Sequence, residues 1–345
     1  MNDSIDDMLF AIQQQNLVYN YNFLYYSNKE TVASLVTLNH PDGWMYEDSG
    51  ANGEVSFDEG TMSCLIQKSS DDSIMTFTQV ISEFPRWQET VPGKKVSALA
   101  VIQNPSSAST DFELTFSIND GISTSSKTIP FKSGDRKEIS LELNVALGAT
   151  KLEVNIECST KKAIIYVNKI YANIGEIALD TLPCIVNGII GERKQYIATE
   201  NPPAEELSLC NAPIALTKDQ TRLNSVLNGR FGKDGNGYSM LLDMRGYFSR
   251  AWDSGATIDP DAADRTTPGT GTITGDHVST FEQDAFLKHD HGLNFSINQQ
   301  IIPGDKPPAV TVINTASTSK TNEDTYEGKE TRPKNIYELY TIKWA

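Results

Sequence analysis

Two histidines stand one residue apart, His289 and His291, in the stretch KHDHG. Residues i and i+2 of an extended strand point to the same side, so both imidazoles would face one way. A closed structural zinc site takes four protein ligands, so this pair is two ligands short. The spacing alone favours a solvent-exposed turn without metal, and a metal site here requires ligands from elsewhere.

A second set of candidate residues is aromatic. Sugar-binding modules stack the apolar face of a pyranose ring on exposed aromatic side chains. Trp44 and Tyr46, in the turn-rich stretch PDGWMYEDSG, and Trp87, two residues after a proline, are the candidates for such contacts. The alternative is that these rings fill a core, where aromatic side chains bury the largest areas.

Patterns typical of catalysis are not found in the sequence. The carboxylate-rich stretch from Asp259 to Asp264 lacks the ligand spacing and central glycine of an EF-hand loop, and is expected to be a solvated turn. There is no serine nucleophile elbow, and neither His40 nor His277 has neighbours that mark it as a catalytic base. We therefore expect a protein that is not an enzyme and has no catalytic residues.

Charge restricts the partners. The chain of 345 residues carries a formal net charge of −16, and no stripe of lysine and arginine is visible. Nucleic-acid binding and attachment to an anionic membrane surface both need a basic face, so neither is expected. No apolar run approaches the roughly 18 residues of a membrane helix. The acidic, polar start does not resemble a signal peptide, which predicts synthesis in a bacterial cytoplasm.

The predicted fold is mainly β. After an arm or short helix over residues 1–15, segments with a period of two alternate with turns rich in Gly, Pro, Ser and Asp up to residue 178. This pattern predicts an antiparallel β-sandwich over 16–178. Residues 179–240 read as a connector. Within it 206–240 is ambiguous between a short helix over 216–227 and loop, and 241–345 reads as a separate tip. Within the tip, 303–335 reads as an extended excursion before a final strand.

The segment 16–178 resembles the jelly-roll carbohydrate-binding modules found in enzymes and tail fibres. The stretches LVYNYNFLYYS, PDGWMYEDSG and ATKLEVNIECSTKKAIIYVNKIYANIGEIA carry the resemblance. It covers about 160 residues and does not fix which face would bind a sugar.

The C-terminal third resembles the collar or receptor-binding region of tail fibres of contractile-tail phages and related injection particles. Five blocks stand in the order of that family: Asp243, Arg245, Gly246, Phe248 and Arg250; Trp252 and Asp253; Gln283 to Phe286; His289 and His291; and Glu330 to Asn335. The chain departs from the family in a long insert between His291 and Glu330, where related fibres vary, and in its ending YTIKWA.

This second resemblance implies a homotrimer. Two histidines from each of three chains would then place six imidazoles around a transition-metal ion on the three-fold axis. An octahedral shell suits iron better than tetrahedral zinc. The resemblance also implies a structural role for the tip motif, with bidentate pairs that join Arg245 and Arg332 to carboxylates such as Asp243 and Glu330; Arg250 and Trp252 belong to the same motif.

The function implied is that of a tail-fibre receptor-binding protein. It would join the baseplate or another fibre protein and attach a phage or phage-tail-like contractile injection particle to a cell-surface glycan or protein. We expect it in the virion or the extracellular particle. Two alternatives stay open at this point: a polysaccharide-degrading tail enzyme, and a purely structural fibre or collar protein.

Overall fold

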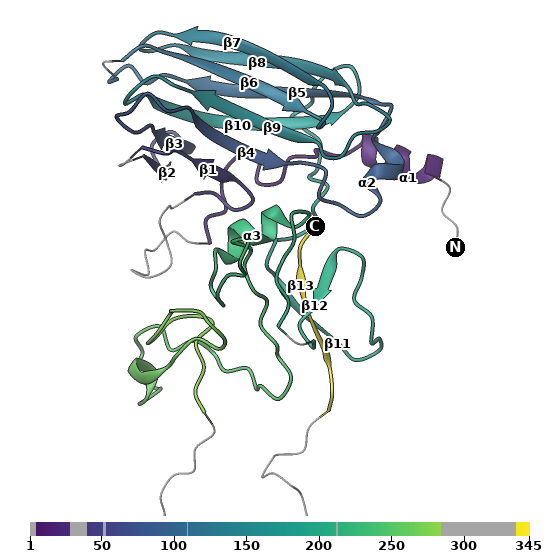
Figure 1. The fold of residues 1–345 in the computed structure, drawn as a ribbon, viewed down its shortest axis with the longest axis vertical. Helices are drawn as coiled ribbons and strands as arrows, with labels where there is room; N and C mark the ends of the chain where they lie inside the picture. The colour runs from purple at the N-terminus through teal and green to yellow at the C-terminus, as the bar shows by residue number, and fades with distance from the viewer. Residues whose placement is uncertain (1–4, 28–39, 51–52, 109, 212, 284–335) are drawn as a thin grey trace, which may run out of the picture. The chain divides into compact units, whose positions relative to one another are not determined.

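The computed structural model describes residues 5–27, 40–50, 53–108, 110–211, 213–283 and 336–345. Most of the regular structure is antiparallel β, in two five-stranded sheets and one three-stranded sheet (Figure 1). The two larger sheets form the predicted β-sandwich, so the predicted fold class is confirmed. No described helix is long and apolar enough to cross a membrane.

Each face of the sandwich is one sheet whose neighbouring strands all run antiparallel. The first sheet has the order β1 (Met45–Glu47), β4 (Met75–Val80), β9 (Glu153–Cys158), β6 (Phe112–Asn119) and β7 (Thr124–Phe131). The second has the order β2 (Glu54–Asp58), β3 (Ser63–Gln67), β10 (Ile164–Ile174), β5 (Lys95–Gln103) and β8 (Arg136–Asn144).

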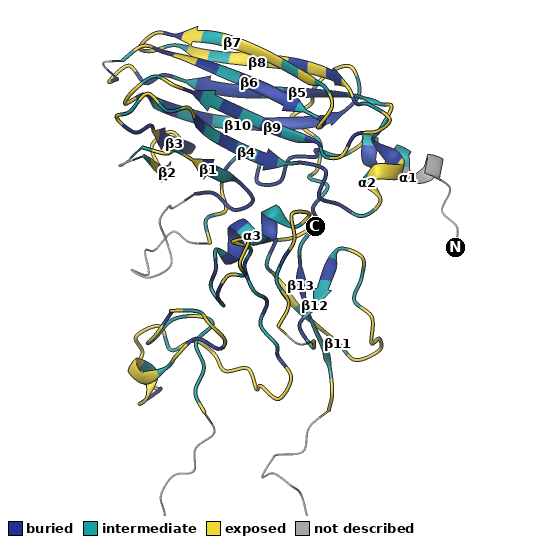
Figure 2. Cartoon of the chain, viewed as in Figure 1, coloured by how far each residue is buried: buried dark blue, intermediate teal, exposed yellow. Residues whose placement is uncertain are grey.

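The sandwich core follows from the period of two along these strands. In β4 and β9 every second side chain is buried, as expected when one face of a sheet packs inward and the other meets solvent. Phe77, Phe116 and Ile156 belong to the large apolar cluster that the inward faces build. The edge strand β7 is mostly exposed, which Figure 2 shows in yellow.

Helices are short and lie outside the sheets. The first described element is α1 (Ile5–Gln13), and α2 (Trp87–Thr90) follows β4. The residues after α1 contact the sandwich, because the N–H of Leu17 donates to the carbonyl of Ala172 at 2.8 Å.

The described residues of 183–282 and 338–345, here called the C-terminal lobe, contain little regular structure. A small sheet has the order β11 (Arg193–Tyr196), β13 (Leu339–Lys343) and β12 (Glu206–Ser208). The helix α3 (Thr221–Leu227) and the 3₁₀ turn η1 (Ala262–Asp264) complete it. A second apolar cluster lies here, and it includes Tyr19 from the N-terminal segment together with Leu223, Val226 and Ile342.

A buried set of hydrogen bonds around Glu83 and Arg222 connects the sandwich to the C-terminal lobe. Glu83 accepts hydrogen bonds from the N–H groups of Thr221 at 2.6 Å and Arg222 at 2.9 Å, so it caps the first turn of α3 from 138 residues away. The guanidinium of Arg222 donates to the carbonyls of Glu83 at 3.1 Å and Leu17 at 3.0 Å. A carboxylate at a helix N-terminus satisfies N–H groups that have no partner within the helix.

Candidate functional site

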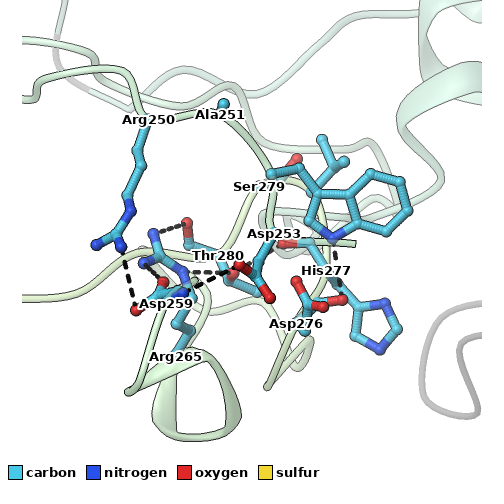
Figure 3. A pocket seen from close by; sticks show the side chains of 11 residues that line it. Arg250, Ala251, Asp253, Asp259, Arg265, Asp276, His277, Ser279 and Thr280 are labelled. Carbon is cyan, nitrogen blue, oxygen red and sulfur yellow. Dashed lines mark hydrogen bonds and ion pairs between the residues drawn. The ribbon is translucent and has the colours of Figure 1, made fainter. Parts of the chain in front are cut away.

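A pocket of about 180 Å³ lies among the loops on either side of η1 (Figure 3). Its lining combines an indole, an imidazole, two guanidinium groups and three carboxylates. The lining residues are Arg250, Ala251, Trp252, Asp253, Asp259, Arg265, Asp276, His277, Val278, Ser279 and Thr280.

Asp253 shapes one wall of the pocket. Its carboxylate accepts backbone hydrogen bonds from Asp259 at 3.0 Å, Thr257 at 2.8 Å and Ile258 at 2.9 Å. These N–H groups, that of Asp259 foremost, hold the pKa of Asp253 below its usual value. The turn is therefore closed by an ionised carboxylate, which accepts stronger hydrogen bonds than a neutral group.

A cluster of ion pairs around Asp259 fixes another part of the lining. Arg265 contacts Asp259 at 3.0 Å and Glu282 at 2.7 Å, and its remaining N–H groups donate to the hydroxyl and the carbonyl of Thr280, both at 3.2 Å. Arg250 contacts the same two carboxylates at 3.4 Å each. Asp259 is buried and Arg265 nearly so, whereas the Arg250 side chain is half exposed. The guanidinium of Arg250 can therefore also donate hydrogen bonds to a ligand in the pocket.

Trp252 lies at the edge of this polar pocket. Its ring N–H donates to the carbonyl of Asp276 at 3.2 Å, and the side chain is 52% exposed. Asp276 uses Oδ2 to accept the N–H of Gly255 at 2.6 Å, while Oδ1 accepts no hydrogen bond from the residues that the structure describes. Figure 3 shows Asp276 and His277 side by side among the lining residues. A fixed, half-exposed aromatic plane thus adjoins available donors and acceptors.

The predicted tip-motif residues divide between two places. Arg250 and Trp252 both line the pocket. Asp243 and Arg245 do not; they form a bidentate pair, with Arg245 Nη2 at 2.6 Å from Asp243 Oδ2 and Nε at 3.0 Å from Oδ1. This pair is largely exposed. Exposed pairs of this kind contribute little to stability, so it fixes the local turn and little more.

The predicted sugar contact of Trp44 is wrong. The side chain is 0% exposed and stacks on Phe77 at 4.7 Å between ring centroids, with Phe23 at 5.2 Å on another side. The turn at Pro41–Gly43 leads directly into β1, and this places the ring between the two sheets. Trp44 fills the core of the sandwich, which was the alternative to a sugar contact.

The other two aromatic candidates are also held by the sandwich. Tyr46 is buried in β1, and its hydroxyl donates to Asp48 at 2.9 Å. Trp87 begins α2 and packs, partly buried, against the sandwich core. Tyr46 therefore offers no exposed ring, whereas Trp87 is only partly covered and its sugar contact stays a prediction.

The remaining predicted site residues, His289, His291, Glu330 and Arg332, lie outside the described residues. Among the residues that are described, no group of three or more His, Cys, Asp or Glu side chains is placed to hold a metal ion. The metal site therefore stays a prediction.

Several pocket residues were missed by the sequence reasoning. Asp259 was expected to be a solvated turn residue, but it is buried and accepts from two arginines. His277 was set aside because it lacks triad neighbours. The composition of 243–282 could have indicated this pocket, because arginines, aspartates and one tryptophan follow one another closely there.

Comparisons with known proteins give remote similarities. No protein-family model matches the chain. Protein RhiB of Rhizobium leguminosarum bv. viciae is 28% identical over 165 residues, which are 47% of this chain and 74% of that protein.

Two solved structures illustrate the similarity in fold. The enzymatically active domain of tailspike protein 4 of bacteriophage CBA120 is 15% identical with a TM-score of 0.33, and the match covers 46% of this chain and 21% of that one. The CBM22-1 xylan-binding domain of Paenibacillus barcinonensis Xyn10C is 12% identical with a TM-score of 0.32, and the match covers 48% and 97%. TM-scores this low do not assign a function to this chain.

Proposed function

We propose that the chain is a glycan-binding attachment protein whose sugar site is the pocket beside Trp252. The observation that carries the proposal is the half-exposed indole, fixed through its N–H, at the edge of a small pocket lined by planar polar side chains. Aromatic faces receive the C–H side of a sugar ring, and nearby carboxylates and guanidinium groups hydrogen-bond its hydroxyls.

The resemblance of the five ordered blocks supports a finer assignment. We propose a homotrimeric receptor-binding protein of a tail fibre, carried by a phage or a phage-tail-like contractile injection particle and joined to its baseplate or to another fibre protein. Three copies turn weak single-site contacts with a cell surface into firm attachment. The predicted metal site belongs to the same proposal: His289 and His291 of three chains would hold one iron or other transition-metal ion. Native mass together with metal analysis tests both, with one ion per three chains expected and a stable monomer contradicting the assignment.

The pocket favours binding over catalysis, although its carboxylates keep a polysaccharide-cleaving enzyme as the second candidate. Both oxygens of Asp253 accept backbone N–H groups, and both oxygens of Asp259 face arginines, so Asp276 Oδ1 is the one oxygen of these three lining carboxylates without a partner among the described residues, and no second free carboxylate stands with it there. A general acid or base needs a free oxygen within reach of the reacting bond. Release of reducing ends from cell-surface polysaccharide would establish the enzymatic alternative.

Trp252→Ala tests the proposed function. On a glycan array and by calorimetry, the variant should bind glycans more weakly than the parent protein. The loss of binding free energy should be about 1–3 kcal/mol, typical of a central aromatic anchor, while the Tm is nearly unchanged. Phe248→Ala is the matched control, because Phe248 is 70% exposed in the same segment but does not line the pocket. Equal losses in both variants, or no glycan binding by the parent protein, would contradict the assignment.

A further inference from the structure

We infer that the pocket beside Trp252 selects an electrically neutral sugar and rejects acidic ones such as uronic or sialic acids. This inference rests on the proposed function and deepens it by naming the class of ligand. It follows from the charges around the pocket, from the groups that are left free, and from the size of the space.

The charges around the pocket are unequal. Two guanidinium groups, Arg250 and Arg265, face the two carboxylates with which they are paired, Asp259 and Glu282. Asp253 and Asp276 remain, and Arg230, which donates to the carbonyl of the lining residue Val278 at 3.1 Å, is a third cation at the pocket. Four carboxylates against three guanidinium groups leave one negative charge. Arg265 is nearly buried in its ion pairs, so a ligand carboxylate would have to displace a protein carboxylate to reach it. At the half-exposed Arg250 a ligand carboxylate would meet Asp259 and Glu282, which already neutralise that guanidinium. A neutral ligand meets no such competition.

The free groups suit hydroxyl ligands. Asp276 Oδ1 is an acceptor without a partner among the described residues, and a hydroxyl is the donor that it lacks. Arg250 makes only long contacts and is half exposed, so its remaining N–H groups are available to a hydroxyl oxygen. Trp252 lies beside Asp276, to whose carbonyl its ring N–H donates, and there a ring face can cover the C–H side of the same sugar.

The space limits how much of a glycan enters. The pocket of about 180 Å³ is smaller than the roughly 300–1,000 Å³ of sites that enclose drug-sized ligands. One ring fits the free groups named above, with the rest of the chain outside. The structure thus points to recognition of a single neutral residue, terminal or on a side branch.

The test compares matched pairs of saccharides that differ only in charge, such as a hexose-terminated oligosaccharide and its uronate counterpart, by calorimetry with the full-length protein. We expect the Kd of the neutral member to be at least tenfold lower than that of the acidic member at low salt. The difference between the two Kd values should shrink as the salt concentration rises. Tighter binding of the acidic member would overturn the inference and leave the proposed function standing. Binding of neither member to the parent protein would overturn both.

A variant that changes the charge of the pocket gives a second, independent test. Asp276→Asn keeps an oxygen for the Gly255 N–H and removes one negative charge. It should therefore lower the ratio of the affinity for the neutral saccharide to that for the acidic one severalfold, while the Tm stays near that of the parent. Asp261→Asn is the matched control, because Asp261 is exposed beside the pocket but does not line it. A ratio unchanged by Asp276→Asn, or lowered equally by Asp261→Asn, counts against the inference.

Discussion

Two tryptophans of this chain have opposite environments, although both follow local sequences rich in turn-forming residues. Trp44 is enclosed by Phe77 and Phe23, whereas Trp252 leaves half of its surface in solvent. The ring N–H of Trp44 is buried without a hydrogen-bond partner among the described residues, which costs about 1–3 kcal/mol. The burial of its large apolar surface must offset that cost, so the residue stabilises the sandwich by packing alone.

Replacement of Trp44 should therefore affect folding and not sugar binding. Trp44→Ala should lower the free energy of unfolding by about 3–5 kcal/mol, because it leaves a cavity between the sheets. Trp44→Phe should cost less, since it removes the unpaired N–H and opens a smaller cavity. Urea unfolding of the three proteins measures this. An unchanged free energy of unfolding in Trp44→Ala, combined with lost glycan affinity, would restore the surface interpretation.

At the scale of elements, a buried cluster joins three strand ends of the sandwich. Lys68, just after β3, has a fully buried ammonium 3.7 Å from Asp48, which follows β1, and 3.4 Å from Asp71 before β4. Asp48 also accepts the N–H of Ser69 at 2.9 Å and the hydroxyl of Tyr46 at 2.9 Å. Strands of both sheets are thus held at one end by a single charged cluster.

This cluster predicts a loss of stability in acid. Burial alone would raise the pKa of Asp48, but the hydrogen bonds from Ser69, Gly50 and Tyr46 lower it from 3.8 to about 2. A lowered folded-state pKa means that the contribution is complete above about pH 4 and disappears as the pH falls towards 2. Asp48→Asn should remove that pH dependence and cost about 3 kcal/mol at pH 7, because it leaves the Lys68 charge short of a partner.

Thermal unfolding between pH 7 and pH 2 checks the acid prediction, with Asp72→Asn as the control. Asp72 pairs with Lys161 on the surface, where the Asp72 side chain is 83% exposed, so its replacement should change little. An Asp48→Asn variant with the acid profile of the parent would show that the cluster does not carry the effect.

The sequence predicts those elements that follow one local rule. Six segments in which apolar and polar residues alternate, 73–81, 95–103, 112–120, 137–145, 150–158 and 163–173, overlap β4, β5, β6, β8, β9 and β10, and the stretch 216–227 contains α3. The strand β7 has the sequence TSSKTIPF; it is an exposed edge strand, so no alternation of apolar residues marks it. Its first residues, which look like a serine-rich turn, are held instead by pairing with β6.

The pocket was beyond sequence reasoning for a different reason. Its contacts join residues far apart in a region with little regular structure, such as Trp252 with Asp276 and Arg250 with Glu282. No periodicity relates such pairs. The motif blocks pointed to the right segment, but not to which side chains of that segment meet.

At the scale of the whole molecule, the C-terminal lobe depends on the sandwich for its core and for its charges. Tyr19, from the N-terminal segment, lies in the apolar cluster of the lobe, and its hydroxyl accepts the N–H of Ile190 at 3.2 Å. Arg222 is fully buried and relies on Glu83 and Leu17 for partners. The buried residues of the sandwich core, by contrast, all lie within 12–174, and from the C-terminal lobe only the partly buried Ile185 is described as packing against them.

Separate fragments should therefore differ in their ability to fold. Residues 1–182 should unfold in one cooperative thermal transition, because a chain of that length buries a sufficient core of its own. Residues 183–345 should show no cooperative transition as a monomer, since α3 loses its cap and the buried Arg222 is left without a counter-charge, which costs about 3–5 kcal/mol in measured cases. Circular dichroism and size-exclusion chromatography of both fragments make the comparison. A monomeric 183–345 fragment that melts cooperatively would mean that the Glu83–Arg222 contact and the burial of Tyr19 are dispensable, and that the lobe is an independent domain.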